Sequence, residues 1–305
     1  MPIISNTTAE LNKFTYYFSI SSSLFIFSIG IIGNILNIII FTSLKTFRKN
    51  PCAFCLLLLS ISDSGFLVFS TVTSAFRELF QQSNDINTVL FCKIPIFFAQ
   101  TFALFSHSIL CLTVIDQYLS TSKIQRRNAI SFKHVQWFIP ILVCLCILHG
   151  FPFFIYYDEQ IIPGTSVSQC RILDTNGTFA KYLYFGVPVV AILLPVSIMT
   201  TFALLSLRNI RSMAKQRVPI IRLRIEQQIT SMVLTKIFSV YISVVPFLLF
   251  YLIRNVILRN TNNLLIQQEL FIASRLFNFL LYVNYAVNKT LNLNIIDFFV
   301  FNLYF

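Results

Sequence analysis

Long apolar runs alternate with short polar segments along most of the chain. A helix needs about 20 apolar residues to cross the hydrocarbon layer of a membrane. The runs are continuously apolar, without the alternation that marks the strands of a membrane β-barrel. The pattern therefore predicts an all-α membrane protein, a bundle of seven transmembrane helices. The expected spans cover residues 18–43, 53–76, 94–115, 135–157, 182–207, 230–253 and 270–291.

The composition agrees with a membrane-embedded chain. Of its 305 residues, 56% are hydrophobic and only 11% are charged, whereas soluble domains carry about 25% charged residues. So much apolar surface does not fit into the core of a water-soluble domain of this length. No internal repeat or separate soluble domain interrupts the runs. We therefore expect residues 1–305 to form one seven-helix domain with a short, atypical tail at 292–305.

The basic residues are distributed unequally between the polar connectors. The net charge of +12 would, in a soluble protein, suggest a nucleic-acid partner. Here the first, third and fifth connectors carry thirteen Lys and Arg residues. The N-terminal segment and the other three connectors carry seven, which seven acidic residues balance. Connectors rich in Lys and Arg face the cytosol. The distribution predicts an N-terminus outside, a C-terminus in the cytosol, and no nucleic-acid partner.

Two glycosylation sequons fall in segments that this topology places outside. Asn6 begins Asn-Thr-Thr in the N-terminal segment, and Asn176 begins Asn-Gly-Thr in the second outer connector. Acceptors of this kind indicate surface loops of secreted or cell-surface proteins. We therefore predict a glycoprotein that crosses the plasma membrane several times and is surrounded by lipid.

Two polar residues interrupt the first two spans. Asn34 lies in the first span, and Asp63 lies in the middle of the second. Polar groups are costly inside a bilayer, and an ionisable one there indicates function by default. An amide can simply join helices by hydrogen bonding, whereas a carboxylate at this depth needs a partner or a proton.

The third span has a cysteine before one end and an acid at the other. Cys92 and Asp116 are separated by 24 residues, or about 36 Å of α-helix, so Cys92 lies outside when Asp116 lies at the inner edge. Cys170 lies in the second outer connector, in an oxidising compartment, where it can pair with Cys92. Pro195 and Pro246 lie inside the fifth and sixth spans, where each removes a backbone donor and permits a kink.

The order of these landmarks resembles that of the rhodopsin-like G-protein-coupled receptors, from the first span to about Asn288. Gly33–Asn34 matches the first-helix motif, and Leu-Ser-Ile-Ser-Asp, which ends at Asp63, matches the second-helix motif. The segment Asn284–Asn288 resembles the seventh-helix pattern. Further matches are Cys92 and Cys170 for the outer disulfide, and Trp137, Pro195 and Pro246 for landmarks of helices four to six.

The resemblance implies a cation site around the mid-membrane carboxylate. The residues that correspond to the family's sodium pocket are Asp63, Ser106, Asn284 and Asn288, with Asn34 in the same polar network. Oxygen ligands of this kind suit a hard cation. The alternative is a protonated Asp63 held in a network of hydrogen bonds. No other cofactor is expected.

The resemblance also narrows the ligand class. Amine receptors of the family carry an Asp where this chain has Ala99, and the opsins' retinal-linking lysine would fall near Tyr282, where no lysine is close. We therefore expect neither an amine nor retinal, but a peptide or a small chemosensory molecule. Aromatic residues of the outer half can line its pocket or simply pack: Phe97, Phe98, Phe102, Phe151 and Phe153.

The inner end of the third span carries the family's signalling motif with one change. Asp116, Gln117 and Tyr118 stand where the family has Asp-Arg-Tyr, and Glu226 corresponds to the acid at the base of the sixth helix. The resemblance implies contact with a heterotrimeric G protein here. Gln117 can donate hydrogen bonds to Asp116 and Glu226 without a charge, so it should form a weaker lock than Arg.

Other departures concern the sixth and seventh spans. Val244 replaces the family's sixth-helix Trp, while Lys289 and Asn292 replace the Pro and Tyr of the seventh-helix motif. The tail 292–305 has no basic residue, unlike the amphipathic helix that usually follows. Our hypothesis is that this tail is a truncated or mis-spliced product.

The leading functional hypothesis is a receptor that passes an outside signal to a heterotrimeric G protein. A channel or transporter is the second class, although internal repeats and interrupted helices, which favour transporters, are absent from the sequence. A non-signalling or degenerate receptor-like protein is the third. No constellation of catalytic residues predicts an enzyme.

Overall fold

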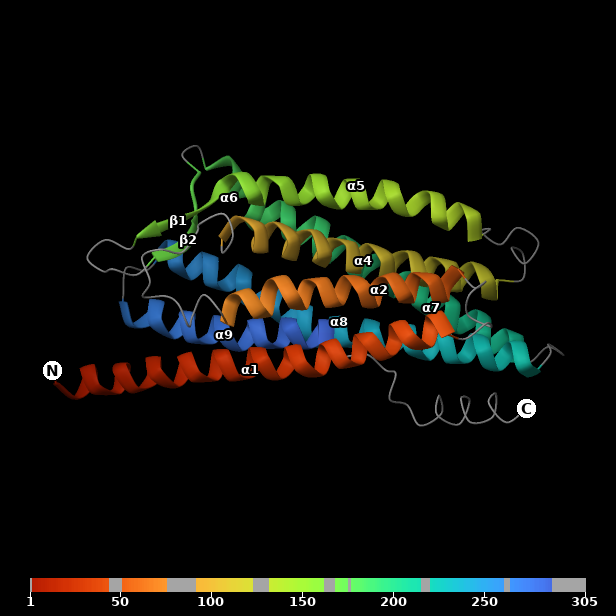
Figure 1. The fold of residues 1–305 in the computed structure, drawn as a ribbon, viewed down its shortest axis with the longest axis horizontal. Coiled ribbons are helices and arrows are strands. Elements are labelled where there is room, and N and C mark those ends of the chain that lie inside the picture. The colour runs from red at the N-terminus through yellow and green to blue at the C-terminus, as the bar shows by residue number, and fades with distance from the viewer. Residues whose placement is uncertain are drawn as a thin grey trace.

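The computed structural model describes residues 2–43, 51–75, 92–122, 132–161, 168–174, 177–214, 220–260 and 264–286. Within these residues, long helices lie side by side as one bundle (Figure 1). They are α1 (Pro2–Ser43), α2 (Pro51–Leu67), α4 (Ile94–Thr121), α5 (Phe132–Tyr156), α7 (Leu194–Ala214), α8 (Ile220–Asn260) and α9 (Leu264–Ala286). The predicted seven-helix fold is confirmed.

Six helices of the described part are long and apolar enough to cross a membrane. They cover Lys13–Ser43, Pro51–Ala75, Ile94–Thr121, Val135–Tyr156, Thr178–Ser212 and Ile229–Arg254. Each of them contains most of one predicted span. The seventh predicted span corresponds to α9, whose described part ends at Ala286 and carries Glu269 and Arg275. These charges and several amides interrupt the apolar run of its described residues.

The helices form a ring around α4. This helix packs against α2, α5, α7 and α8, while α1 and α9 close the ring through α2 and α8. Among the long helices, α5 packs mainly against α4. Its outward face is an apolar stripe at helical spacing, formed by Trp137, Ile141, Leu145 and Leu148, all of them exposed. An apolar stripe that faces away from a membrane bundle is suited to contact with lipid.

Three helices approach one another so closely at Gly30 of α1 that a side chain would not fit there. A Cβ atom at Gly30 would lie 2.5 Å from Leu67 Cδ1 in α2 and 2.9 Å from Ala286 Cβ in α9. Small residues at such crossings let backbones come together in membrane bundles. Gly30 therefore lets α1 seat between its two neighbours.

A short hairpin, not predicted from the sequence, lies between α5 and the fifth helix. Its strands β1 (Tyr157–Ile161) and β2 (Ser168–Ile172) are antiparallel, with Glu159 opposite Cys170. It lies at the same end of the bundle as the start of α1 (Figure 1). The chain then enters the fifth helix through α6 (Thr178–Lys181) and the π-helical segments η4 (Tyr182–Gly186) and η5 (Pro188–Leu193).

Some predicted features lie outside the described residues. These are Asn176, Asn288 and the tail 292–305. The backbones of Asn6 and Glu226 lie in α1 and α8, but their side chains are outside the description. The predicted roles of all these residues stay predictions.

Candidate functional site

A buried ion pair joins the second and sixth helices at the centre of the bundle. Lys236 Nζ of α8 lies 2.7 Å from Asp63 Oδ2 of α2. The Asp63 side chain is fully buried, and that of Lys236 is 6% exposed. The distance is that of a charge-assisted hydrogen bond. Asp63 therefore has the partner that a carboxylate at this depth requires, and the partner is a lysine that the sequence interpretation did not consider.

Two further helices complete the coordination of this pair. Ser106 Oγ of α4 donates to Asp63 Oδ1 at 2.6 Å. Lys236 Nζ also donates to the main-chain oxygen of Asn284 in α9 at 2.6 Å. Both carboxylate oxygens are thus used, and one ammonium group bridges α2, α8 and α9. We call Asp63, Ser106, Lys236 and Asn284 the central polar cluster.

The serines beside Asp63 explain how α2 presents the carboxylate. Ser60 and Ser64 donate to main-chain oxygens one turn earlier in their own helix, at 3.1 and 2.8 Å. Ser62 instead donates to the main-chain oxygen of Phe102 in α4 at 2.8 Å. Hydrogen bonds of this kind hold helices together in membranes. The bond from Ser62 fixes α2 against α4 next to the ion pair.

Asn34 takes the interhelical role that its sequence position allowed. Its Nδ2 donates to the main-chain oxygen of Tyr285 in α9 at 3.3 Å. Asn34 is fully buried, and Tyr285 stacks on Phe66 of α2 with ring centroids 3.7 Å apart. The carbonyls of Asn284 and Tyr285 are consecutive, so α9 receives one donor from α8 and one from α1.

The central polar cluster does not fit the predicted sodium ion. One observation favours an ion: within the described residues, the buried Oδ1 of Asn284 has no hydrogen-bond partner. The ammonium of Lys236, however, already neutralises Asp63 at contact distance. A second cation at the same carboxylate would lie within a few Å of that ammonium and be repelled by it.

The motif at the C-terminal end of α4 makes a contact that was not predicted. Gln117 Nε2 donates to Thr230 Oγ1 of α8 at 2.7 Å. The predicted bonds of Gln117 to Asp116 and Glu226 stay predictions, because the Glu226 side chain lies outside the described residues. Gln117 is 1% exposed and Asp116 is also buried. Tyr118 packs edge-on against Phe202 of α7 at 5.5 Å. The motif therefore joins α4 to α7 and α8.

A largely open groove lies beside this contact, between α7 and α8. Its volume is about 580 Å³. Thr230, the acceptor for Gln117, forms part of its wall, with Leu207, Ile210 and Phe238 among the apolar residues around it.

Substitutions at this contact should change the resting activity of a coupled receptor. Thr230→Val keeps the shape of the side chain but removes the acceptor, a loss of about 1 kcal/mol. We expect basal nucleotide exchange on the G protein to rise about fivefold. Gln117→Arg keeps a donor and adds a charge beside Asp116, so basal exchange should fall. Equal basal exchange in both variants and the unmodified chain, at matched surface amounts, would contradict this role.

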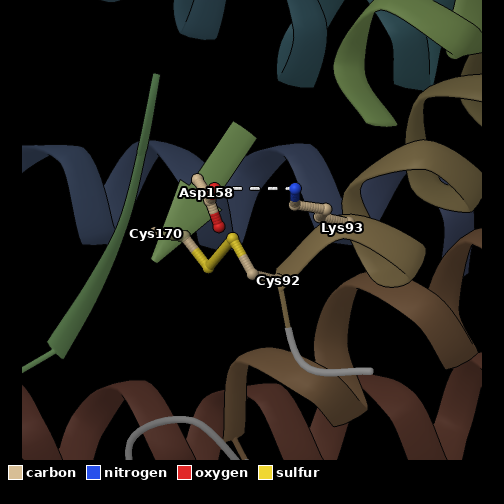
Figure 2. The surroundings of a disulfide bond; sticks show 4 residues. All are labelled: Cys92, Lys93, Asp158 and Cys170. Carbon is tan, nitrogen blue, oxygen red and sulfur yellow. Dashed lines mark ion pairs between the residues drawn. A yellow bond between two sulfur atoms is a disulfide. The ribbon is translucent and has the colours of Figure 1, made fainter. Parts of the chain in front are cut away.

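The predicted disulfide is confirmed. Cys92 and Cys170 are bonded, with Cα atoms 5.8 Å apart. The bond ties the start of α4 to strand β2 of the hairpin (Figure 2). Beside it, Lys93 Nζ lies 3.6 Å from Asp158 Oδ2 of strand β1, so both strands are attached to the same end of α4.

Loss of the disulfide should destabilise the protein. The bridge closes a segment with a sequence separation of 78 residues. Disulfides typically contribute about 2–4 kcal/mol, and the contribution grows with the length of the closed segment. We expect Cys92→Ser with Cys170→Ser to lower the unfolding temperature measured in detergent micelles. Cys144→Ser is the matched control, because Cys144 is free and exposed. An equal effect of both changes would argue against a stabilising role.

The aromatic residues expected near a ligand pocket pack against one another. Phe97 contacts Phe98 and Phe151 edge-on, at centroid distances of 5.0 and 6.4 Å, and Phe98 stacks near Phe102 at 6.2 Å. Phe153 is buried and forms a second cluster with Phe179 and Leu183. These contacts support the packing interpretation. The ligand role stays a prediction.

The two prolines lie where the sequence placed them. Pro246 is inside α8, and Pro195 is the second residue of α7, directly after the π-helical segment η5. Val244, in place of the family's Trp, is 1% exposed and belongs to the main hydrophobic core. A kink at either proline stays a prediction.

Fold and site together define a multi-pass membrane protein, a seven-helix bundle with a polar centre and a disulfide at one end. The family model of the seven-transmembrane receptors of the rhodopsin family matches residues 33–288, and the chain belongs to this family. This is a family of receptors rather than enzymes, whose partners are in general G proteins and extracellular ligands. Among curated proteins, none matches the chain significantly.

Sequence reasoning missed Lys236 and Thr230. The signal for Lys236 was available, because it is a lysine inside the apolar span 230–253 and such residues pair with other groups in the bundle. Thr230 gave no comparable signal, since threonines in membrane helices commonly bond within their own helix.

Proposed function

We propose that this chain is a G-protein-coupled receptor that transmits an extracellular ligand signal to a heterotrimeric G protein through movement of α8. The observation that carries the proposal is the pair of polar links that hold α8. One is the ion pair of Lys236 with Asp63, and the other is the hydrogen bond between Gln117 and Thr230. Both lie between Pro246 and the inner end of the helix.

The geometry of α8 suits a hinged movement. Lys236 precedes Pro246 by ten residues and Thr230 precedes it by sixteen, about 15 and 24 Å along the helix axis. A swing about Pro246 would displace Thr230 further than Lys236 and would break both links. Ligand binding need only favour the displaced arrangement over the resting one. The inner ends of α4, α7 and α8 would then open to the G protein.

The ligand we propose is a peptide or a small chemosensory molecule. Ala99 gives no carboxylate at the position where amine receptors of this family pair with the ligand ammonium. Ala99 is partly buried and packs with Phe102 and Tyr282 in a hydrophobic cluster. A cationic ligand group would find no counter-charge there, and retinal would find no lysine at Tyr282.

We place the receptor in the plasma membrane, with its N-terminus outside and its C-terminus in the cytosol. The excess of basic residues in the first, third and fifth connectors supports this orientation. The disulfide supports it too, because such bonds form in oxidising compartments and this one lies at the end of the bundle where α1 begins. Asn6 and Asn176 are the proposed glycosylation sites on that side.

Nucleotide exchange on purified heterotrimeric G proteins tests the function. Cell membranes that contain the chain are mixed with each G-protein class and a peptide and small-molecule library. We expect ligand-dependent exchange on at least one class, absent from membranes without the chain. Transport of labelled solutes by proteoliposomes, without exchange on any class, would support a channel or transporter instead. Binding of a ligand without exchange would support a non-signalling receptor, an outcome that Gln117 in place of Arg makes worth testing.

A further inference from the structure

The central polar cluster has a cation that is part of the chain. Lys236 Nζ lies at contact distance from Asp63 Oδ2 and from the main-chain oxygen of Asn284, while Ser106 donates to Asp63 Oδ1. We propose that the Lys236 ammonium is the resident cation of this site, that it excludes sodium, and that its presence at Asp63 is therefore coupled to the position of α8.

Electrostatics explains the exclusion. The pair of Asp63 and Lys236 has no net charge, so it offers no attraction to a further cation. A sodium ion about 4 Å from the ammonium would lose affinity by roughly 1000-fold at the effective dielectric constant of a protein. To bind, sodium must first displace Lys236, which would leave an ammonium buried without a counter-ion.

The covalent attachment of the ammonium to α8 makes Lys236 a stronger competitor for Asp63 than a dissolved ion. An ion from solution occupies a site according to its concentration, whereas a side chain on a neighbouring helix is held beside the carboxylate at a high effective concentration. A dissolved ion would also leave α8 free to move. The ammonium belongs to α8, so this helix cannot leave its resting place without separating two buried charges.

This inference concerns the resting bundle, so it does not depend on the proposed coupling to a G protein. Its test uses thermal unfolding of the purified full chain. The protein is heated in NaCl and in choline chloride at equal ionic strength, over a titration of salt. We expect the unmodified chain to unfold at the same temperature in both salts at each concentration.

The Lys236→Met variant, in contrast to the unmodified chain, should respond to sodium. Removal of the ammonium leaves Asp63 without its partner, so the unfolding temperature in choline chloride should fall by about 5 °C or more. Sodium should now bind at Asp63 and restore part of the loss. Lys93→Met is the matched control, since it removes a partly exposed ammonium from the pair with Asp158; it should behave like the unmodified chain.

Two results would overturn the proposal. One is a saturable, sodium-specific rise in the unfolding temperature of the unmodified chain that Asp63→Asn abolishes. The other is a Lys236→Met chain as stable as the unmodified one in choline chloride. If Lys236→Met does not fold, the sodium titration of the unmodified chain decides the matter by itself.

Discussion

Asp63→Asn should lower the free energy of unfolding by about 3–5 kcal/mol, because it leaves the buried ammonium of Lys236 without a counter-ion. The double variant Asp63→Asn, Lys236→Met should lose much less. Its amide can still accept the hydrogen bond from Ser106, and methionine fills a similar volume without a charge. Replacement of both members of a buried ion pair by neutral groups is often nearly neutral in stability.

A double-mutant cycle measures this coupling. Unfolding is followed in detergent micelles for the unmodified chain, each single variant and the double variant. We expect a coupling energy of about 2–3 kcal/mol, well above the error of additive, distant changes. Losses that simply add would mean that Asp63 and Lys236 do not stabilise each other, in contradiction to the 2.7 Å contact.

Basal signalling should rise when the ion pair is removed. The pair joins α8 to α2 and, through the carbonyl of Asn284, to α9. Movement of α8 in the unmodified chain must separate these charges inside the membrane. The double variant Asp63→Asn, Lys236→Met has no such penalty, so its displaced arrangement should be at least about tenfold more populated, the equivalent of 1.4 kcal/mol.

Basal nucleotide exchange on the responding G protein measures this population. Surface amounts of the two chains are matched, and Lys93→Met serves as a control for the loss of a lysine elsewhere. We expect exchange to rise about tenfold in the double variant and to stay unchanged in the control. Unchanged exchange in the double variant would show that the ion pair does not restrain the signalling movement.

Much of the fold follows from the sequence for a simple reason. Each span is long and continuously apolar, and a helix is the structure that satisfies its own backbone inside a bilayer. The disulfide was accessible for a similar reason, since Cys92 and Cys170 are placed on the same side by the topology. The start of α1 was not accessible from the sequence. The helix begins at Pro2, but the polar segment before residue 18 has no apolar periodicity that would predict it.

Three of the four residues of the central polar cluster were also accessible from the sequence. Asp63, Ser106 and Asn284 were placed together by a motif resemblance. In the structure Ser106 bonds directly to Asp63, and Lys236 links Asp63 to Asn284. The contribution of α8 was not accessible in the same way. This helix exposes Phe238, Ile242 and Leu249 and buries Ile237, Val240 and Val244.

Apolar residues on both faces of α8 conceal which face meets the bundle. The rotation of the helix therefore had to come from the structure. The same ambiguity explains the contact of Gln117. An acid one turn before Thr230, Glu226, was the more obvious partner by charge, but the bond that the structure describes is to the hydroxyl of Thr230.

We infer that the ion pair of Asp63 and Lys236 holds α8 in the resting bundle. Spin labels at Gln227 in α8 and Trp137 in α5 can report the distance between these helices, since both residues are exposed. Cys144 is replaced by Ser to prevent labelling of an exposed thiol. Electron–electron double resonance should give one distance in the otherwise unmodified chain and an additional, longer distance in the Asp63→Asn, Lys236→Met variant. Identical distance distributions in the two chains would contradict the claim.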